Sequence, residues 1–203
     1  MSRYPICCCC AEDNQRMYLD RLIYWAGQFG TEPFLSDYEL HVFCDGNFIY
    51  NAWLLRKLGV VLHPQPKIGR TSTSVFQSYK RSFLNMCKTF PDEFSICEND
   101  VLLLDKSKFI EYTKKQGLFC GYSKKYKFIE TALMVINDSD CISRFVAHYE
   151  KDGAIYENVD FEVTLTRLVR QEGKEFNSVF TGERREKDIS FDHNGDYVAQ
   201  YFG

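Results

Sequence analysis

The sequence predicts a single α/β domain with a mostly parallel central sheet flanked by helices. Short apolar runs alternate with longer stretches in which apolar residues recur at helical spacing. This alternation is typical of a parallel sheet whose crossover helices pack on its faces. The 203 residues also fit one domain, since a single core of that size buries about 70% of the surface of the unfolded chain. We therefore expect residues 1–203 to form one unit, either alone or as one domain of a longer protein.

Polar and turn-forming residues delimit the predicted elements. The first apolar run ends at Glu12-Asp13-Asn14, as a buried parallel strand does where it reaches the surface. Gly30 closes the helical pattern that follows it, and Pro91 ends the longest one. The predicted strands are residues 4–11, 38–44, 59–63, 94–97, 101–104, 118–122, 128–136 and 176–180. The predicted helices are residues 17–29, 48–58, 71–90, 106–115, 139–150 and 160–171, with 45–46 as a turn and 64–70 as an irregular loop.

Composition excludes several classes of protein. Hydrophobic residues make up 45% of the chain and aromatic residues 16%, which is more than a disordered chain carries. No apolar run reaches the roughly 18 residues of a membrane helix, and residues 1–6 do not resemble a secretory signal. With a net charge of −3 and scattered basic residues, a broad nucleic-acid surface is not expected. The sequence thus predicts a soluble, cytoplasmic protein that does not bind nucleic acid.

The chain contains nine cysteines, four of them consecutive at positions 7–10. Neighbours in a strand point to opposite faces, so these four cannot bridge one another or converge on a zinc ion without a turn between them. We expect buried thiols, with metal or disulfide roles as the alternative.

Two acidic clusters follow predicted strands, Glu12-Asp13 and Glu98-Asn99-Asp100. In doubly wound sheets, ligands bind outside the carboxyl ends of strands near the point where the strand order reverses. Two carboxylates separated by one residue, like those of Glu98 and Asp100, can hold a hard divalent ion and leave coordination positions open for phosphate oxygens. The ion then offsets the charge that develops on a departing diphosphate. The alternative is a polar turn between two strands.

Five segments follow one another along the chain: Cys10-Ala11-Glu12-Asp13-Asn14, Tyr79-Lys80-Arg81, Glu98-Asn99-Asp100-Val101-Leu102, residues 128–137 and Asp160-Phe161-Glu162. In this order they resemble the motifs A-x-D-D-N, Y-A-R, D-x-D then V-L, F-N-x-G-hhh-I-N (where h is apolar) and D-Q-D of the A-type (GT-A) glycosyltransferases, most closely glycosyltransferase family 8. The resemblance covers residues 4–168 and suggests a virus-encoded or bacterial member. Two departures are Glu98, where the family has Asp, and Ile129-Glu130-Thr131, where it has N-x-G.

The resemblance implies a role for each matched residue. The first segment would hold the base and ribose of a nucleotide sugar, and Arg81 would reach its phosphates. Lys67 and Arg70 are weaker candidates for the phosphates. The nucleotide-sugar-binding residues would be Cys10, Ala11, Glu12, Asp13, Asn14, Arg70, Arg81, Glu98 and Asn99. The metal ligands would be Glu98, Asp100 and His193, and the catalytic carboxylates would be Asp160, Glu162 and Glu130.

Simpler roles exist for several of these residues. Asp13 or Asn14 would serve equally well as the N-cap of the helix predicted to follow. Arg81 and His193 would also be satisfied by solvent, one on a helix face and the other in the C-terminal tail. In Glu98 the extra methylene, relative to Asp, leaves direct coordination of a metal open.

Together these features predict a metal-dependent glycosyltransferase. It would use Mn²⁺ or Mg²⁺ and move a hexosyl or deoxyhexosyl group from a UDP-sugar to a hydroxyl of a glycan or glycoconjugate. One alternative is a sugar-phosphate nucleotidyltransferase, although no Gly-rich, basic phosphate loop follows the first predicted strand. The other alternative is a binding module that has kept the fold and lost the chemistry.

Overall fold

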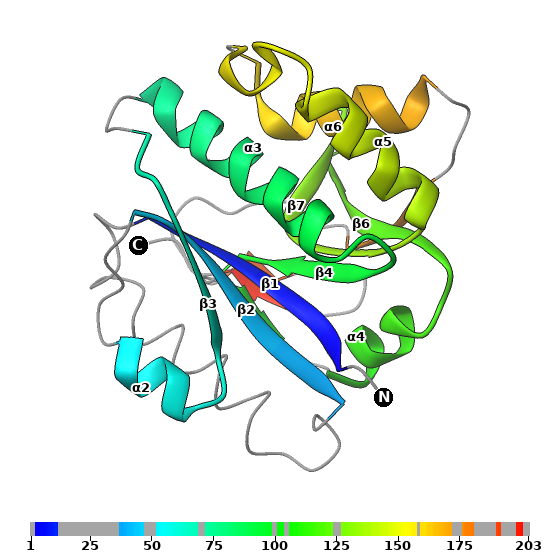
Figure 1. The fold of residues 1–203 in the computed structure, drawn as a ribbon. Coiled ribbons are helices and arrows are strands. Elements are labelled where there is room, and N and C mark those ends of the chain that lie inside the picture. The colour runs from blue at the N-terminus through cyan, green and yellow to red at the C-terminus, as the bar shows by residue number, and fades with distance from the viewer. Residues whose placement is uncertain are drawn as a thin grey trace.

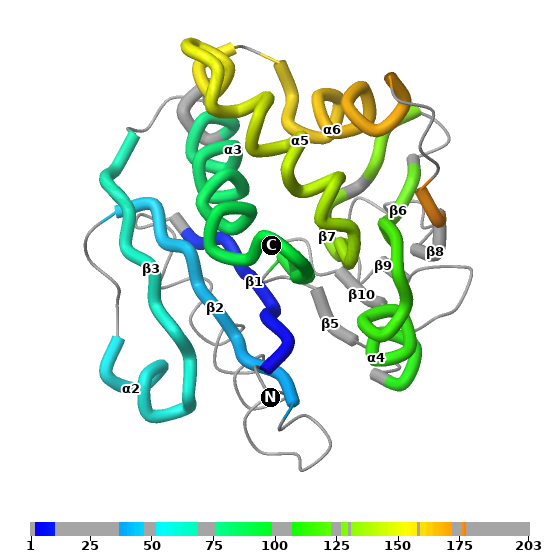
Figure 2. Tube along the Cα trace, turned by 45° about the vertical axis from the view of Figure 1, so that its right-hand side comes forward, coloured from blue at the N-terminus to red at the C-terminus, as the bar shows by residue number. Residues whose placement is uncertain are grey.

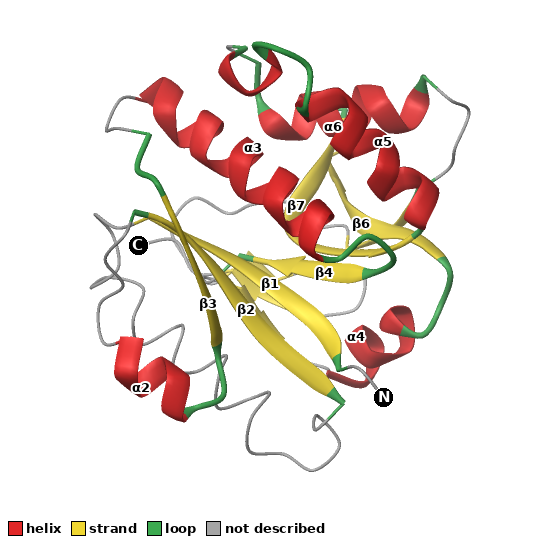
Figure 3. Ribbon diagram, viewed as in Figure 1, coloured by secondary structure: helices red, strands yellow, loops and turns green. Residues whose placement is uncertain are grey.

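A seven-stranded sheet with helices on both faces organises the chain (Figures 1 and 3). The computed structural model describes residues 3–11, 37–46, 52–68, 72–98, 101–103, 106–123, 127–157, 159–171, 176–180, 190–191 and 198–200. The large sheet contains β1 (Tyr4–Ala11), β2 (Tyr38–Asp45), β3 (Val61–Gln65), β4 (Phe94–Cys97), β6 (Gly117–Ser123), β7 (Phe128–Asn137) and β8 (Asn177–Phe180).

The strands of this sheet lie in the order β3-β2-β1-β4-β7-β6-β8. β7 runs antiparallel to both of its neighbours, and the other pairs are parallel. The mostly parallel sheet predicted from the sequence is therefore confirmed.

A second, antiparallel sheet joins the C-terminal strands to the middle of the chain. It consists of β5 (Val101–Leu103), β10 (Val198–Gln200) and β9 (Ser190–Phe191), in that order. The sequence predicted β5 from its unbroken apolar run but neither of its partners, because neither Ser190–Phe191 nor Val198–Gln200 is part of such a run.

Two layers of helices cover the large sheet. On one face lie α3 (Ser72–Thr89), α5 (Ser139–Tyr149) and α6 (Phe161–Arg170), side by side in Figures 1 and 2. The other face packs against α2 (Ala52–Lys57) and α4 (Lys106–Thr113). A short 3₁₀ turn, η3 (Ala154–Tyr156), links α5 to α6. No helix in the described ranges combines the length and apolar character needed to cross a bilayer.

The cysteine run of β1 supplies both faces of the core. Cys8 and Cys10 pack in the layer of α2 and α4, whereas Cys7 and Cys9 pack in the layer of α3, because successive strand residues point to opposite faces. All nine cysteines lie in described residues and are thiols, and eight of them are buried. The prediction of buried thiols is confirmed.

Three predicted boundaries are corrected. Asp45, expected in a turn, belongs to β2. β3 begins at Val61 and includes Pro64 and Gln65, which were assigned to a loop; a proline fits there because β3 is an edge strand, where an amide donor can be absent. Gly59, expected in that strand, instead ends α2 with a φ of +82°, a conformation that favours glycine. The helix predicted over residues 17–29 lies outside the described residues.

Two histidines connect β2 to the edge strand β3. His41 Nδ1 lies 3.0 Å from His63 Nε2, and His41 Nε2 lies 3.1 Å from a carboxylate oxygen of Glu39. Because a carboxylate accepts, His41 donates through Nε2 and accepts through Nδ1 from His63. Burial, assisted by the nearby His63, lowers the pKa of His41 to about 4, although Glu39 opposes the shift.

Acid is expected to destabilise the fold through His41. Its pKa in the folded state lies below the value of about 6.5 for an unfolded histidine, so the unfolded chain binds the extra proton first as the pH falls. The free energy of unfolding should therefore decrease between about pH 6.5 and about pH 4. Urea denaturation across this range should show a smaller decrease for His41→Phe than for the wild type. An equal decrease in the free energy of unfolding of the two proteins would contradict the assignment of this acid sensitivity to His41.

Candidate functional site

The order of the large sheet defines where a ligand is expected. β1 lies between β2 and β4, so the chain leaves β1 toward β2 and β3 and later returns to β4 on the other side of β1. In open α/β sheets, ligands bind outside the carboxyl ends of the strands at such a reversal. Here the two strands lead directly into Glu12-Asp13-Asn14 and Glu98-Asn99-Asp100.

Glu98, the first residue after β4, is held by α3 and β7. Its backbone amide donates to Ala132 O at 2.8 Å, and its carboxylate Oε1 accepts from the Tyr79 hydroxyl at 3.3 Å. Burial raises the pKa of Tyr79 well above its usual value, and the carboxylates of Glu98 and Glu162 raise it further. Tyr79 therefore remains protonated, and thus a hydrogen-bond donor, at neutral pH.

Beyond the end of β4, side chains of α6 accept hydrogen bonds from backbone amides of β7 that a neighbouring strand would otherwise accept. The β4–β7 ladder ends at the pair Cys97 and Leu133. Farther along β7, Thr131 N donates to Glu162 Oε1 at 2.9 Å, and Ile129 N donates to Thr166 Oγ1 at 2.7 Å. Residues four apart in a helix are about 6 Å apart along its axis, close to the roughly 6.7 Å between alternate strand residues. The spacing of α6 thus matches two successive amides on one edge of β7.

The Glu162 carboxylate is oriented by two donors of one residue. Its Oε1 also accepts from the Thr131 hydroxyl at 3.2 Å. Asp160, two positions earlier, is the N-cap of α6, since its Oδ1 accepts from Glu162 N at 2.8 Å. Asp160 and Glu162, two of the three carboxylates predicted as catalytic, therefore have structural partners in the fold, and Tyr79 lies close enough to both Glu98 and Glu162 to respond to their charges.

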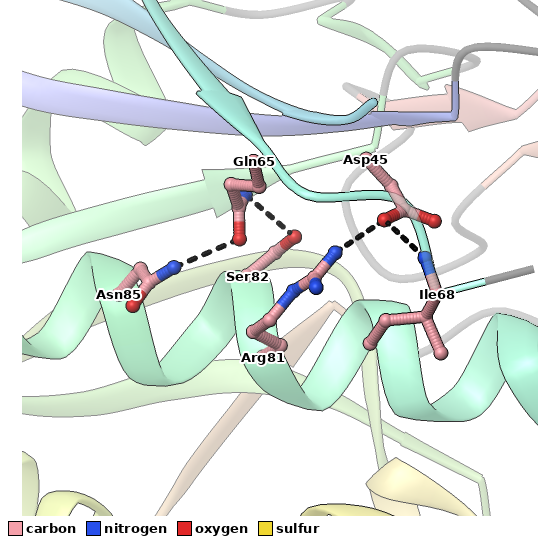
Figure 4. A network of polar contacts seen from close by, with 6 residues as sticks. All are labelled: Asp45, Gln65, Ile68, Arg81, Ser82 and Asn85. Carbon is pink, nitrogen blue, oxygen red and sulfur yellow. Dashed lines mark hydrogen bonds and ion pairs between the residues drawn. The ribbon is translucent and has the colours of Figure 1, made fainter. Parts of the chain in front are cut away.

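A second polar cluster ties the ends of β2 and β3 to α3 (Figure 4). Arg81 forms an ion pair with Asp45, which also accepts from Ile68 N at 3.3 Å. Gln65 donates to Ser82 at 3.1 Å and accepts from Asn85 at 2.8 Å. Arg81, predicted to reach phosphates, thus has a carboxylate partner within the protein, and its Nε is buried with no hydrogen-bond partner among the described residues.

The structure describes fewer than half of the predicted site residues in full. Cys10 is buried beside Cys44 at the ends of β1 and β2, and Ala11 is paired with Asp45. Glu130 is paired with Gly121 in the ladder of β6 and β7, and its side chain is outside the description. Seven predicted residues lie wholly outside the described ranges: Glu12, Asp13, Asn14, Arg70, Asn99, Asp100 and His193.

Sequence reasoning missed two residues of this edge. Asp45 was assigned to a turn, although a single acid at the end of an apolar run was a usable signal. Thr131 was noted only as a departure from a motif, and nothing in the sequence indicates that it orients Glu162.

Of the three predicted metal ligands, Glu98 alone lies within the described residues. Glu98 supplies a carboxylate, the ligand type that Mn²⁺ and Mg²⁺ prefer. No three His, Cys, Asp or Glu side chains converge as a metal site within the described ranges. The chemistry of Glu98 fits such an ion, and the other two predicted ligands are Asp100 and His193.

Comparisons with solved structures show which proteins share this fold. A cytidylyltransferase from Leptospira borgpetersenii serovar Hardjo-bovis (strain JB197) has a TM-score of 0.54 and 12% identity over 97% of this chain and 84% of its own. The glycosyltransferase GlyE of Streptococcus pneumoniae TIGR4 has a TM-score of 0.50 and 11% identity, over 88% of this chain and 45% of its own. A 4-diphosphocytidyl-2C-methyl-D-erythritolsynthase from Anaerococcus prevotii DSM 20548 has a TM-score of 0.50 and 11% identity, over 89% of this chain and 88% of its own.

These similarities establish the fold. Nucleotidyl- and glycosyltransferases share it, which confirms the predicted fold class. No protein-family profile and no curated protein sequence matches the chain.

Proposed function

We propose that the chain is a metal-dependent glycosyltransferase of the GT-A kind, resembling family 8, that transfers a hexosyl or deoxyhexosyl group from a UDP-sugar to a hydroxyl of a glycan or glycoconjugate. The observation that carries the proposal is the position of Glu98, Tyr79 and Glu162. They lie together just beyond the end of β4, where the strand order reverses, and Glu98 is itself the first residue of the acidic motif Glu98-Asn99-Asp100.

Glu98, Asp100 and His193 are the residues proposed to hold Mn²⁺ or Mg²⁺. The strands before and after His193, β9 and β10, belong to the small sheet with β5, which begins immediately after Asp100. In this pairing Gln200 lies opposite Val101, the residue after Asp100, whereas Val198, the end of β10 nearer to His193 in the sequence, lies opposite Leu103. The pairing therefore supports a C-terminal strand beside the acidic motif, and the choice of His193 as a ligand rests on the resemblance to family 8. The ion would neutralise charge on the diphosphate of the donor.

The protein's own groups would bind the donor and move a proton. The segment from Cys10 to Asn14 would hold the nucleoside. Arg81 would contact the diphosphate, since a guanidinium has five N–H donors and Asp45 does not use them all. Glu162, whose Oε1 is held by Thr131, would accept the proton of the acceptor hydroxyl.

Asp100→Ala is expected to abolish metal-dependent binding of UDP while leaving the fold intact. Titration of UDP with Mn²⁺ by calorimetry measures the affinity, and a thermal-shift panel of UDP, GDP and CMP identifies the base. Ligand at about 100 times its dissociation constant stabilises by roughly 2.7 kcal/mol. Asp140→Ala, at an exposed position on α5, is the control and should bind as the wild type does. Unchanged UDP affinity in Asp100→Ala would overturn the metal assignment.

A sugar-phosphate nucleotidyltransferase is the second candidate. The similarity of the fold to a cytidylyltransferase over 97% of this chain favours it, whereas the absence of a Gly-rich basic loop after β1 counts against it. Two assays on the same preparation separate the candidates. Release of UDP from UDP-glucose or UDP-galactose supports glycosyl transfer, and release of pyrophosphate from CTP or UTP with a sugar phosphate supports nucleotidyl transfer. Binding of UDP without either reaction would identify a non-catalytic module.

A further inference from the structure

Three consecutive residues of α3 form hydrogen bonds or ion pairs with residues in or beside three different elements around the candidate site. Tyr79 donates to Glu98 after β4, Lys80 donates to the backbone of Glu157 before α6, and Arg81 pairs with Asp45 at the end of β2. Successive helix residues point about 100° apart, so one turn of α3 can contact the ends of β4 and β2 and the segment before α6. Tyr79 and Arg81 face parts of the site already described, whereas the bond of Lys80 has no role in the proposed reaction.

Lys80 is a buried cation. Its side chain is 1% exposed, and its Nζ donates to Glu157 O at 2.7 Å. Burial lowers the pKa of the ammonium, while the carboxylates of Glu157 and Asp160 oppose that shift. Taking an ammonium out of water costs free energy, and the bond to the carbonyl of Glu157 offsets the cost only in part. A lysine is thus a poor choice for stability alone at this position.

The carbonyl that Lys80 binds lies three residues before the N-cap of α6. From there, Asp160 caps the helix, Phe161 packs against the Tyr79 ring with centroids 4.9 Å apart, and Glu162 reaches Thr131. The direction and start of α6 therefore depend on where the chain is held just before Asp160. Among the described residues, Lys80 provides a side-chain bond from α3 to that segment.

We propose that Lys80 is a positioning residue, which anchors the segment before α6 so that Glu162 is held against β7 beside Tyr79 and Glu98. Lys80 does not contact the substrate. The effect on turnover rests on the proposed function, but the effect on the order of α6 does not.

Lys80→Met tests the proposal, because methionine has a similar length and no ammonium. The amides of residues 159–166 should exchange with deuterium at least about tenfold faster than in the wild type, since opening of the helix start becomes easier. The melting temperature should change by less than about 4 °C, because losing the desolvated charge offsets losing the bond. With UDP-glucose or UDP-galactose and Mn²⁺, kcat should fall about tenfold or more, and the KM for the donor should stay within about twofold.

Lys88→Met is the matched control. Lys88 lies on the same helix and pairs with Glu150 at 2.6 Å, with both side chains about half exposed, so its loss should change neither exchange nor kcat. Lys80→Arg, which keeps the charge and N–H donors, is the second variant and should retain slow exchange in residues 159–166.

Each outcome decides the proposal. Unchanged exchange in a folded Lys80→Met, or a large loss of melting temperature with normal kcat for the folded fraction, would show a purely structural lysine. If Lys80→Met does not fold, fast exchange in Lys80→Arg would also overturn the proposal. If the wild type turns over neither donor, the proposed function fails, while the exchange result still decides the role of Lys80.

Discussion

Arg81→Met is expected to lower the free energy of unfolding by about 3 kcal/mol, because it leaves the Asp45 carboxylate buried without its cation. Side chains of the pair are 18% and 8% exposed, so solvent compensates little for the loss. For a chain of this size, the melting temperature should fall by about 6–12 °C. Urea denaturation followed by circular dichroism measures the change.

The double variant Asp45→Asn/Arg81→Met tests whether the loss of stability comes from the unpaired buried charge. Removing both charges should restore much of the stability, since the asparagine oxygen still accepts from Ile68 N and no buried charge remains. Lys115→Met, which breaks the exposed pair with Glu111, should lower the stability far less, because solvent screens an exposed pair. An Arg81→Met protein as stable as the wild type would mean that Asp45 is not buried against Arg81 in solution.

With the proposed function, Glu98→Gln is expected to reduce kcat for UDP-sugar turnover by about 100-fold, equivalent to about 2.7 kcal/mol of transition-state stabilisation. The glutamine oxygen can still accept the Tyr79 hydroxyl, so the fold should be preserved, but a neutral amide is a weaker partner for a divalent cation. Release of UDP from UDP-glucose or UDP-galactose with Mn²⁺ measures the effect.

Tyr79→Phe separates the charge of the Glu98 carboxylate from its orientation by the Tyr79 hydroxyl. It removes the hydrogen bond and keeps the carboxylate, so kcat should fall by about tenfold if Tyr79 only orients Glu98, the lower end of the roughly 10- to 100-fold effect of removing a group that orients a metal ligand. A Glu98→Gln enzyme with more than half of the wild-type kcat would exclude Glu98 from the reaction.

The alternation of strands and helices followed from the sequence alone. Apolar runs such as residues 94–97 were predicted with their observed bounds, and α3, α5 and α6 within two residues at either end, because burial imposes a period that local composition displays. The ends of β1 and β4 could be recognised as candidate ligand positions for the same reason, since polar clusters follow buried runs there.

Tertiary structure alone decided which side chains meet. The antiparallel pairing of β7 with β4, the pairing of β5 with β10, the Arg81–Asp45 pair and the contact of Glu162 with Thr131 join residues 31 to 99 positions apart. Hydrogen bonds and ion pairs act over a few ångströms, and no local pattern records which distant partner will lie within that range. The sequence by itself therefore determined an α/β sheet with acids at its carboxyl edge, and packing determined which of those acids are held by Tyr79, Thr131 and Arg81.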